Sequence, residues 1–160
     1  MSKLPAALQK RLNQHKTKWA IDSDELTKRC AMANLTYTQA LPPLGDNATH
    51  AIVLLSFNTI VSALEAARTT YKDYSLREEY IRVRGGVYRI AFEKPLSQQD
   101  EEIEQIEKQI KAQYQSELDA IKQQYIDNLT SELLAEKQAA ESMKSAEEEE
   151  QLKKALLDLI

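Results

Sequence analysis

The sequence predicts a mainly α-helical fold, with a small N-terminal helical domain that carries one β-hairpin at about residues 80–92. A long C-terminal helix or coiled-coil arm follows this domain. Three observations lead to this expectation. The 160 residues include only 3 glycines and 4 prolines, with no proline after residue 95, which favours helix over sheet. Apolar residues recur with a helical period through most of the chain. The period changes to two residues only around a Gly-Gly pair.

The charge distribution predicts where the chain divides. Residues 1–94 hold 14 Lys and Arg against 9 Asp and Glu, a net charge of +5. Residues 95–160 hold 7 against 16, a net charge of −9. We therefore expect a helical domain with a basic hairpin at 1–94 and an acidic arm at 95–160. Such asymmetry indicates that the two parts meet different surroundings, or each other.

The first predicted helix is basic and amphipathic. It begins at Pro5, because proline is favoured in the first turn, and ends at about Trp19. Its remaining surface carries lysines and an arginine, including Lys10 and Arg11, and no acid precedes Asp22. This pattern is typical of an ordinary surface helix, or of a segment that binds a membrane surface or nucleic acid.

Two further helices are expected before the hairpin. Asp22 with Glu25 three residues later resembles a capping box, and Pro42-Pro43 would end the helix that follows. The third helix, at about residues 48–71, is apolar around most of its circumference. We therefore expect it to be buried at the centre of the N-terminal domain.

The predicted hairpin has one apolar face and one basic face. Gly85 and Gly86 suit a two-residue type I′ turn, in which both residues have positive φ. Because side chains alternate along a strand, the turn also fixes the register and the faces. The expected pairs are Ile81 with Ile90, Arg82 with Arg89, Val83 with Tyr88, and Arg84 with Val87. The core-directed face would carry Ile81, Val83, Tyr88, Ile90 and Phe92, and the other face Arg82, Arg84 and Arg89.

The predicted arm begins at Ser97, and an apolar seam runs along it. The seam residues are Ile103, Ile106, Ile110, Tyr114, Leu118, Ile121 and Tyr125, and the pattern continues to Leu133. Their mean spacing, roughly 3.75 residues, slightly exceeds the α-helical period. Since the rest of the arm is polar and acidic, we expect the seam to need a partner. After Leu133 the seam weakens, and both a hinge near residues 142–145 and a continuous helix are compatible with the sequence.

The sequence contains no motif for catalysis, a metal or a cofactor, so we expect a protein that is not an enzyme. The single cysteine, Cys30, rules out an intramolecular disulfide, and His15 and His50 are isolated. No secretory signal precedes the first helix, and the most apolar run is too short to cross a bilayer. We therefore expect a cytoplasmic protein without a membrane span.

Two functions fit these expectations. The first is a non-enzymatic interaction or regulatory protein that self-associates, or docks a protein partner, through the coiled-coil arm. In that case the hairpin arginines would meet acids of the chain itself or of a partner. The second is a dimeric nucleic-acid-binding regulator, which would contact phosphates through Arg82, Arg84, Arg89, Lys10 and Arg11. Its layout would be similar to that of some winged-helix regulators, in which a hairpin forms the wing.

Overall fold

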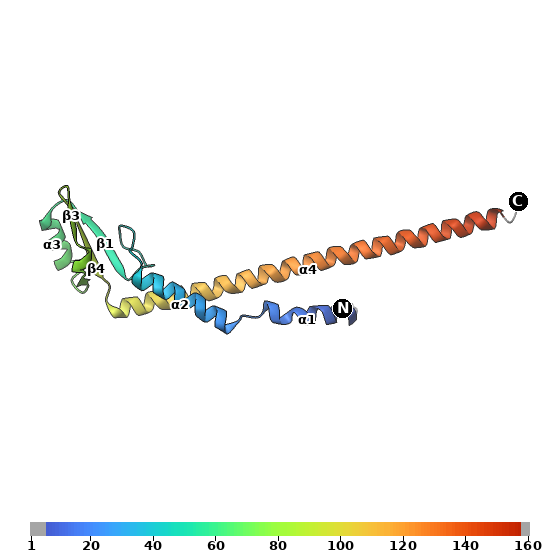
Figure 1. Cartoon of the computed structure of the whole chain (residues 1–160), viewed down its shortest axis with the longest axis horizontal. Coiled ribbons are helices and arrows are strands. Elements are labelled where there is room, and N and C mark those ends of the chain that lie inside the picture. Colours follow the sequence, from blue (N-terminus) through green and yellow to red (C-terminus); the bar gives the residue numbers. More distant parts are fainter. Residues whose placement is uncertain (1–5, 158–160) are drawn as a thin grey trace. The chain divides into compact units, whose positions relative to one another are not determined.

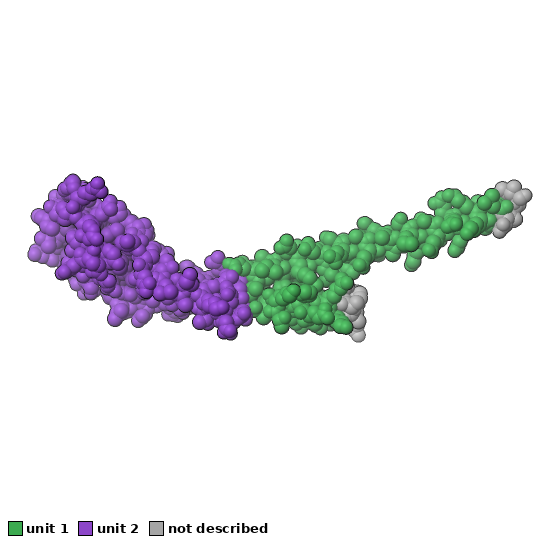
Figure 2. All heavy atoms as spheres, viewed as in Figure 1, with its two compact units in different colours: residues 1–20, 116–160 green, residues 21–115 purple. Residues whose placement is uncertain are grey.

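The computed structural model describes residues 6–157 and confirms the mainly α-helical fold with a hairpin and a long C-terminal helix (Figure 1). The chain forms two compact units: residues 1–20 with 116–160, and residues 21–115 (Figure 2). The elements in chain order are α1 (Ala6–His15), the 3₁₀ helix η1 (Lys16–Trp19), α2 (Ser23–Gln39), β1 (Ile52–Phe57), α3 (Ile60–Arg68), β2 (Ser75–Leu76), the 3₁₀ helix η2 (Glu78–Tyr80), β3 (Arg82–Arg84), β4 (Val87–Glu93) and α4 (Leu96–Leu157).

The first two predicted helices are present. The α-helical part of the first ends at His15, and its last turn is the 3₁₀ helix η1. Asp22 caps α2 as expected, because its carboxylate accepts hydrogen bonds from the backbone N–H groups of Asp24 (2.9 Å) and Glu25 (3.4 Å). The helix ends before the Pro42-Pro43 pair.

The predicted third helix is wrong in its first half. Residues 52–57 form strand β1, and only residues 60–68 are helical, with Thr59 as the N-cap of α3. A short apolar run has no periodicity that separates a buried strand from a buried helix. Whether such a run forms a strand or a helix depends on the segment that it pairs with. Here β1 pairs along its whole length with β4, which lies about 35 residues further along the chain.

Strand β4 organises a four-stranded antiparallel sheet in the second unit. It pairs with β1 on one side, and with β2 and β3 on the other. The predicted hairpin register is confirmed for the pairs Arg82–Arg89, Val83–Tyr88 and Arg84–Val87. Gly85 (φ 58°) and Gly86 (φ 78°) both have positive φ, as the turn between these strands requires. Ile81 lies just before β3, so its predicted pair does not form part of the ladder.

The apolar face of the sheet is buried near β1 and open at the hairpin tip. Val53 and Phe92 are buried there, and the ring of Tyr71 stacks on Phe92 at 4.9 Å between centroids. The prediction that the whole apolar hairpin face points into the core is therefore correct only in part. Ile90 and Tyr88 are half-buried, and Val83 is 61 % exposed. The cause is that β3 is a three-residue edge strand, and all of its residues are exposed.

Helix α4 is unbroken from Leu96 to Leu157, including the stretch at 142–145 where a hinge was the alternative. Its residues 96–115 belong to the second compact unit and its later residues to the first. The predicted boundary at residues 94–95 coincides with the start of α4 and stays a prediction about domains. No helix in the described range 6–157 has the length and apolar character that a membrane span needs.

Candidate functional site

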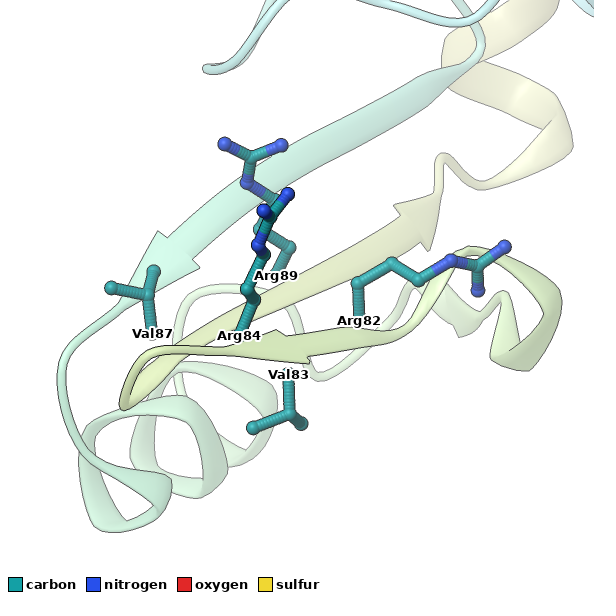
Figure 3. A pocket seen from close by; sticks show the side chains of 5 residues that line it. All are labelled: Arg82, Val83, Arg84, Val87 and Arg89. Atoms are coloured by element: carbon teal, nitrogen blue, oxygen red, sulfur yellow. The ribbon is translucent and has the colours of Figure 1, made fainter.

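The basic face of the β3–β4 hairpin is the candidate functional site. Arg82 and Arg84 lie on β3 and Arg89 lies on β4, and Arg82 stands directly opposite Arg89. Figure 3 shows Arg84 and Arg89 projecting on the same side of the strands, with Val83 on the opposite side. We call Arg82, Arg84 and Arg89 the arginine face. The structure thus brings together the three hairpin arginines that the sequence predicted.

The arginine face borders a shallow, open hollow of about 460 Å³. Val87, opposite Arg84, gives it a small apolar floor, and Ser56 of β1 lies beside Arg89 in the ladder. The face therefore combines cationic, apolar and hydroxyl groups on one rigid antiparallel ladder. Such a surface can bind carboxylates or phosphates, because a guanidinium donates two parallel hydrogen bonds to either group.

Within residues 6–157, no carboxylate lies within 4.0 Å of a nitrogen of these three guanidiniums. Arg82 instead donates to the backbone carbonyls of Glu79 and Ile81, both at 2.8 Å. A nearby arginine shows the contrast, because Arg77 binds Glu79 at 2.7 Å and Glu93 at 2.6 Å. The acids next to the hairpin thus neutralise Arg77 and leave the arginine face uncompensated.

The other two predicted basic residues lie elsewhere. Lys10 and Arg11 are exposed on α1, in the first compact unit, and the structure does not place them with the hairpin. Arg11 borders a separate hollow of about 450 Å³ together with His15, Tyr125 and Glu132. An acid therefore shares the surroundings of Arg11, unlike those of the arginine face.

The predicted seam of α4 packs largely on the chain's own N-terminal helices. In the second unit, the guanidinium of Arg29 on α2 lies 4.4 Å from the ring centroid of the buried Tyr114. The seam residues before Tyr114, namely Ile103, Ile106 and Ile110, are half-buried.

In the first unit, the ring of Tyr125 lies 4.7 Å from His15 and 5.5 Å from Trp19. Leu118 is buried, but Ile121 is 55 % exposed and so departs from the predicted seam. The cause is the helical period, because at 100° per residue Ile121 lies about 80° around the helix from Leu129, whereas Leu118 lies only about 20° from it.

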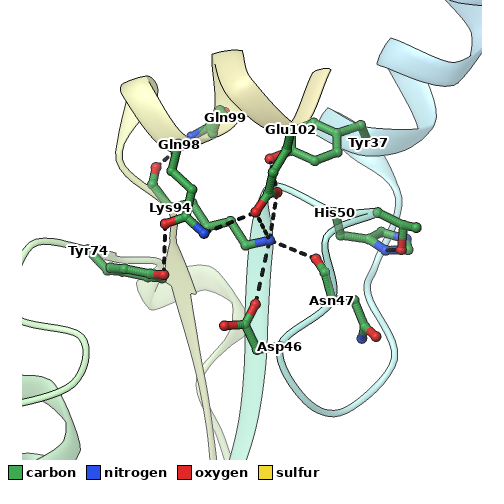
Figure 4. Close-up of polar contacts among 10 residues, drawn as sticks. Tyr37, Asp46, Asn47, His50, Tyr74, Lys94, Gln98, Gln99 and Glu102 are labelled. Carbon is green, nitrogen blue, oxygen red and sulfur yellow. Dashed lines mark hydrogen bonds and ion pairs between the residues drawn. The ribbon is translucent and has the colours of Figure 1, made fainter. Parts of the chain in front are cut away.

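A buried polar cluster at the start of α4 was not predicted. The Lys94 ammonium, whose side chain is fully buried, donates to Glu102 (2.8 Å and 3.1 Å) and to the backbone carbonyl of Asn47 (2.7 Å) (Figure 4). Asp46 lies 3.5 Å away, and the Tyr37 hydroxyl donates to Glu102 at 2.6 Å. These contacts join α2, the loop before β1, the end of β4 and α4.

The cluster shifts the titration of its members. Burial disfavours the charged Glu102, but hydrogen bonds from Lys94, Tyr37 and Gln98 outweigh this and lower the pKa of its carboxyl. Burial, together with the neighbouring Glu102 carboxylate, raises the pKa of the Tyr37 hydroxyl far above its usual value. Each charge thus has its partner inside the cluster, which is the arrangement of a structural ion pair.

Among the residues that the structure describes, no group of three or more His, Cys, Asp and Glu side chains is arranged to hold a metal ion. Comparison with protein-family models, with curated proteins and with solved structures found no match to this chain. The arginine face and the surface of α4 are therefore the features of the described residues that bear on function.

Proposed function

We propose that this chain is a non-enzymatic interaction protein that self-associates through the distal part of α4, residues 134–157. The observation that supports the proposal is the exposure of these residues to solvent. All 24 residues of this stretch are exposed, including apolar side chains that are 55–74 % exposed. These side chains are Leu134, Met143, Leu152, Leu156 and Leu157.

Three of the exposed leucines of distal α4 gather on one side of the helix, and Leu157 lies about 100° away from Leu156. At 100° per residue, Leu134, Leu152 and Leu156 fall within an arc of about 40°. We call these three residues the leucine side. A leucine stripe on an otherwise polar helix is the arrangement that docks into an apolar groove or pairs with a second helix. The seam before residue 134 is largely covered within the chain, apart from the exposed Ile121. The leucine side is therefore an apolar stripe of α4 that remains open to a partner.

Local interactions alone stabilise distal α4 only weakly. Ion pairs one turn apart join Glu149 to Lys153 (2.7 Å) and Glu150 to Lys154 (3.5 Å). Each such exposed pair stabilises a helix by about 0.3–0.5 kcal/mol. A polar helix held by such pairs gains most of its stability when its apolar side packs on another element. Association would therefore both bury the leucine side and stabilise the helix.

The test replaces the leucine side in the full-length chain. The triple variant L134Q/L152Q/L156Q keeps residues of good helix propensity and removes the apolar stripe. We expect wild-type chain to increase in mass with concentration in sedimentation velocity and light scattering, and the triple variant to remain a monomer. The matched control M32Q/V61Q removes two exposed apolar side chains outside α4 and should associate like wild type.

A wild-type chain that stays monomeric over the whole concentration range would contradict self-association. A triple variant that associates as strongly as wild type would contradict the role of distal α4. Circular dichroism at high dilution checks that the substitutions leave the helix content of the monomer unchanged.

A further inference from the structure

The arginine face lacks an anion that its geometry favours. Arg82 stands directly opposite Arg89, and like charges on paired strands destabilise a sheet unless an anion lies between them. Residues 80–92 contain no acid, and the described part of the chain brings no carboxylate within 4.0 Å of these guanidiniums. An external carboxylate or phosphate would relieve this repulsion.

The same chain carries an acidic stripe on α4 whose carboxylates are only partly paired within the chain. Residues 127–150 hold 8 Asp and Glu against 2 Lys. At 100° per residue, Glu136, Met143, Glu147 and Glu150 fall within an arc of about 60°, on the side of the helix opposite the leucine side. Along the described chain, neither Glu136 nor Glu147 has a cation within 4.0 Å. Glu150 is paired with Lys154 at 3.5 Å. Helix formation therefore gathers carboxylates that the molecule itself neutralises only in part.

The backbone positions that carry the two sets of charges have similar spacings. Residues three apart on a helix are about 5–6 Å apart, which describes Glu147 and Glu150. Residues two apart on a strand are about 6.6 Å apart, which describes Arg82 and Arg84. Met143 lies one turn before Glu147, where it can contact the apolar floor that Val87 provides.

A carboxylate partner fits the surroundings of the face better than nucleic acid does. Residues 21–115 hold 11 Lys and Arg against 14 Asp and Glu, so the unit that carries the face has a net charge of −3. This charge repels an extended polyanion and leaves only three guanidiniums to contact phosphates. Non-specific affinity for nucleic acid grows with the number of phosphates neutralised, so three contacts give weak binding. A short acidic helix presents only a few carboxylates, and three guanidiniums are enough to contact them.

We infer that the arginine face of one copy binds the acidic stripe at residues 143–150 of α4 in a second copy. This inference rests on the proposed function, because it requires distal α4 to act as a binding element, and it names one partner surface. The contact is heterologous, since each copy offers a face and a stripe, and it can therefore link copies head to tail. Because its ion pairs lie at the surface, the contact is weak individually and is screened by salt.

The test reverses the charges on each side in the full-length chain. Sedimentation velocity at 50 mM and 500 mM NaCl measures how association depends on salt. We expect wild type to associate about 10-fold more tightly at low salt, because salt screens ion pairs at the surface. R84E/R89E and E147R/E150R should each remove this low-salt gain in affinity. The quadruple variant R84E/R89E/E147R/E150R should restore it, because the charges on the two surfaces are exchanged. The control E141R/E148R makes the same change in net charge on another side of the same helix and should keep the gain.

The outcomes separate the two proposals. If reversal on either side leaves the low-salt gain intact, or the quadruple variant fails to restore it, the inference is overturned while leucine-dependent association stands. If wild type is monomeric at both salt concentrations, self-association itself fails and the inference fails with it. Binding of the chain to a fluorescent 20-mer DNA or RNA is measured as a third test. If R84E/R89E loses binding to the 20-mer but keeps wild-type association, the face binds phosphates and the inference is overturned.

Discussion

Helix α4 contains two regions of similar backbone and opposite surroundings. In residues 96–133, the seam side chains Tyr114, Leu118 and Leu129 are only 6–7 % exposed, because α1 and α2 run beside their respective parts of the helix. In residues 134–157, every residue is exposed. Helical periodicity alone therefore does not indicate where a helix is stabilised. Packing stabilises the first region, and local ion pairs alone hold the second.

The two regions also differ in what an ion pair contributes. Lys94–Glu102 and Lys153–Glu149 have similar N–O distances of 2.8 Å and 2.7 Å, but the side chains are 0 % and 16 % exposed in the first pair and 68 % and 67 % exposed in the second. We expect K94M to lower the free energy of unfolding by about 3–5 kcal/mol, because it removes the buried cation of the pair and leaves the largely buried Glu102 carboxylate without it.

K153M is the matched control for this substitution, and we expect it to cost less than about 1 kcal/mol. Urea unfolding followed by circular dichroism at a low, fixed protein concentration measures both variants. Equal effects would contradict the distinction between a packed and a solvated region of α4.

Two leucines of α4 differ in the same way in the burial of their apolar side chains. Leu118 is 6 % exposed and Leu134 is 56 % exposed. L118A should destabilise the monomer by about 2–4 kcal/mol, since it removes buried methyl groups and leaves a cavity. L134A should change the stability of the monomer by no more than about 0.5 kcal/mol. Thermal and urea unfolding of dilute samples test both values. A large effect of L134A at high dilution would mean that its side chain is buried within a single copy.

The features that sequence could predict depend on local geometry. The Gly85-Gly86 turn fixed the hairpin register and the arginine face, because alternation follows once the turn is set. The Asp22 cap and the start of α4 were found for the same reason. Strand β1 was read as a helix, because its identity depends on β4, far along the chain.

The buried Lys94–Glu102–Tyr37 cluster escaped prediction because its members come from three separate segments. Each of them also looks ordinary alone: a lysine before a proline, a glutamate in an acidic helix and a tyrosine on an apolar stripe. The sequence also could not predict that, within the described residues, the arginine face has no carboxylate partner. The composition shows an excess of acids in the second part of the chain, but it cannot show that the acids next to the hairpin bind Arg77 instead.

Hydrogen exchange along α4 distinguishes a region that is stabilised within one copy from a region that is stabilised by association. Amides in residues 96–133 should be protected to the same extent in dilute and concentrated samples, because packing within one copy stabilises that region. Amides in residues 134–157 should exchange rapidly when dilute and become protected as concentration rises, in wild type but not in L134Q/L152Q/L156Q. Protection of residues 134–157 that is equally strong in dilute samples and in the triple variant would contradict the account.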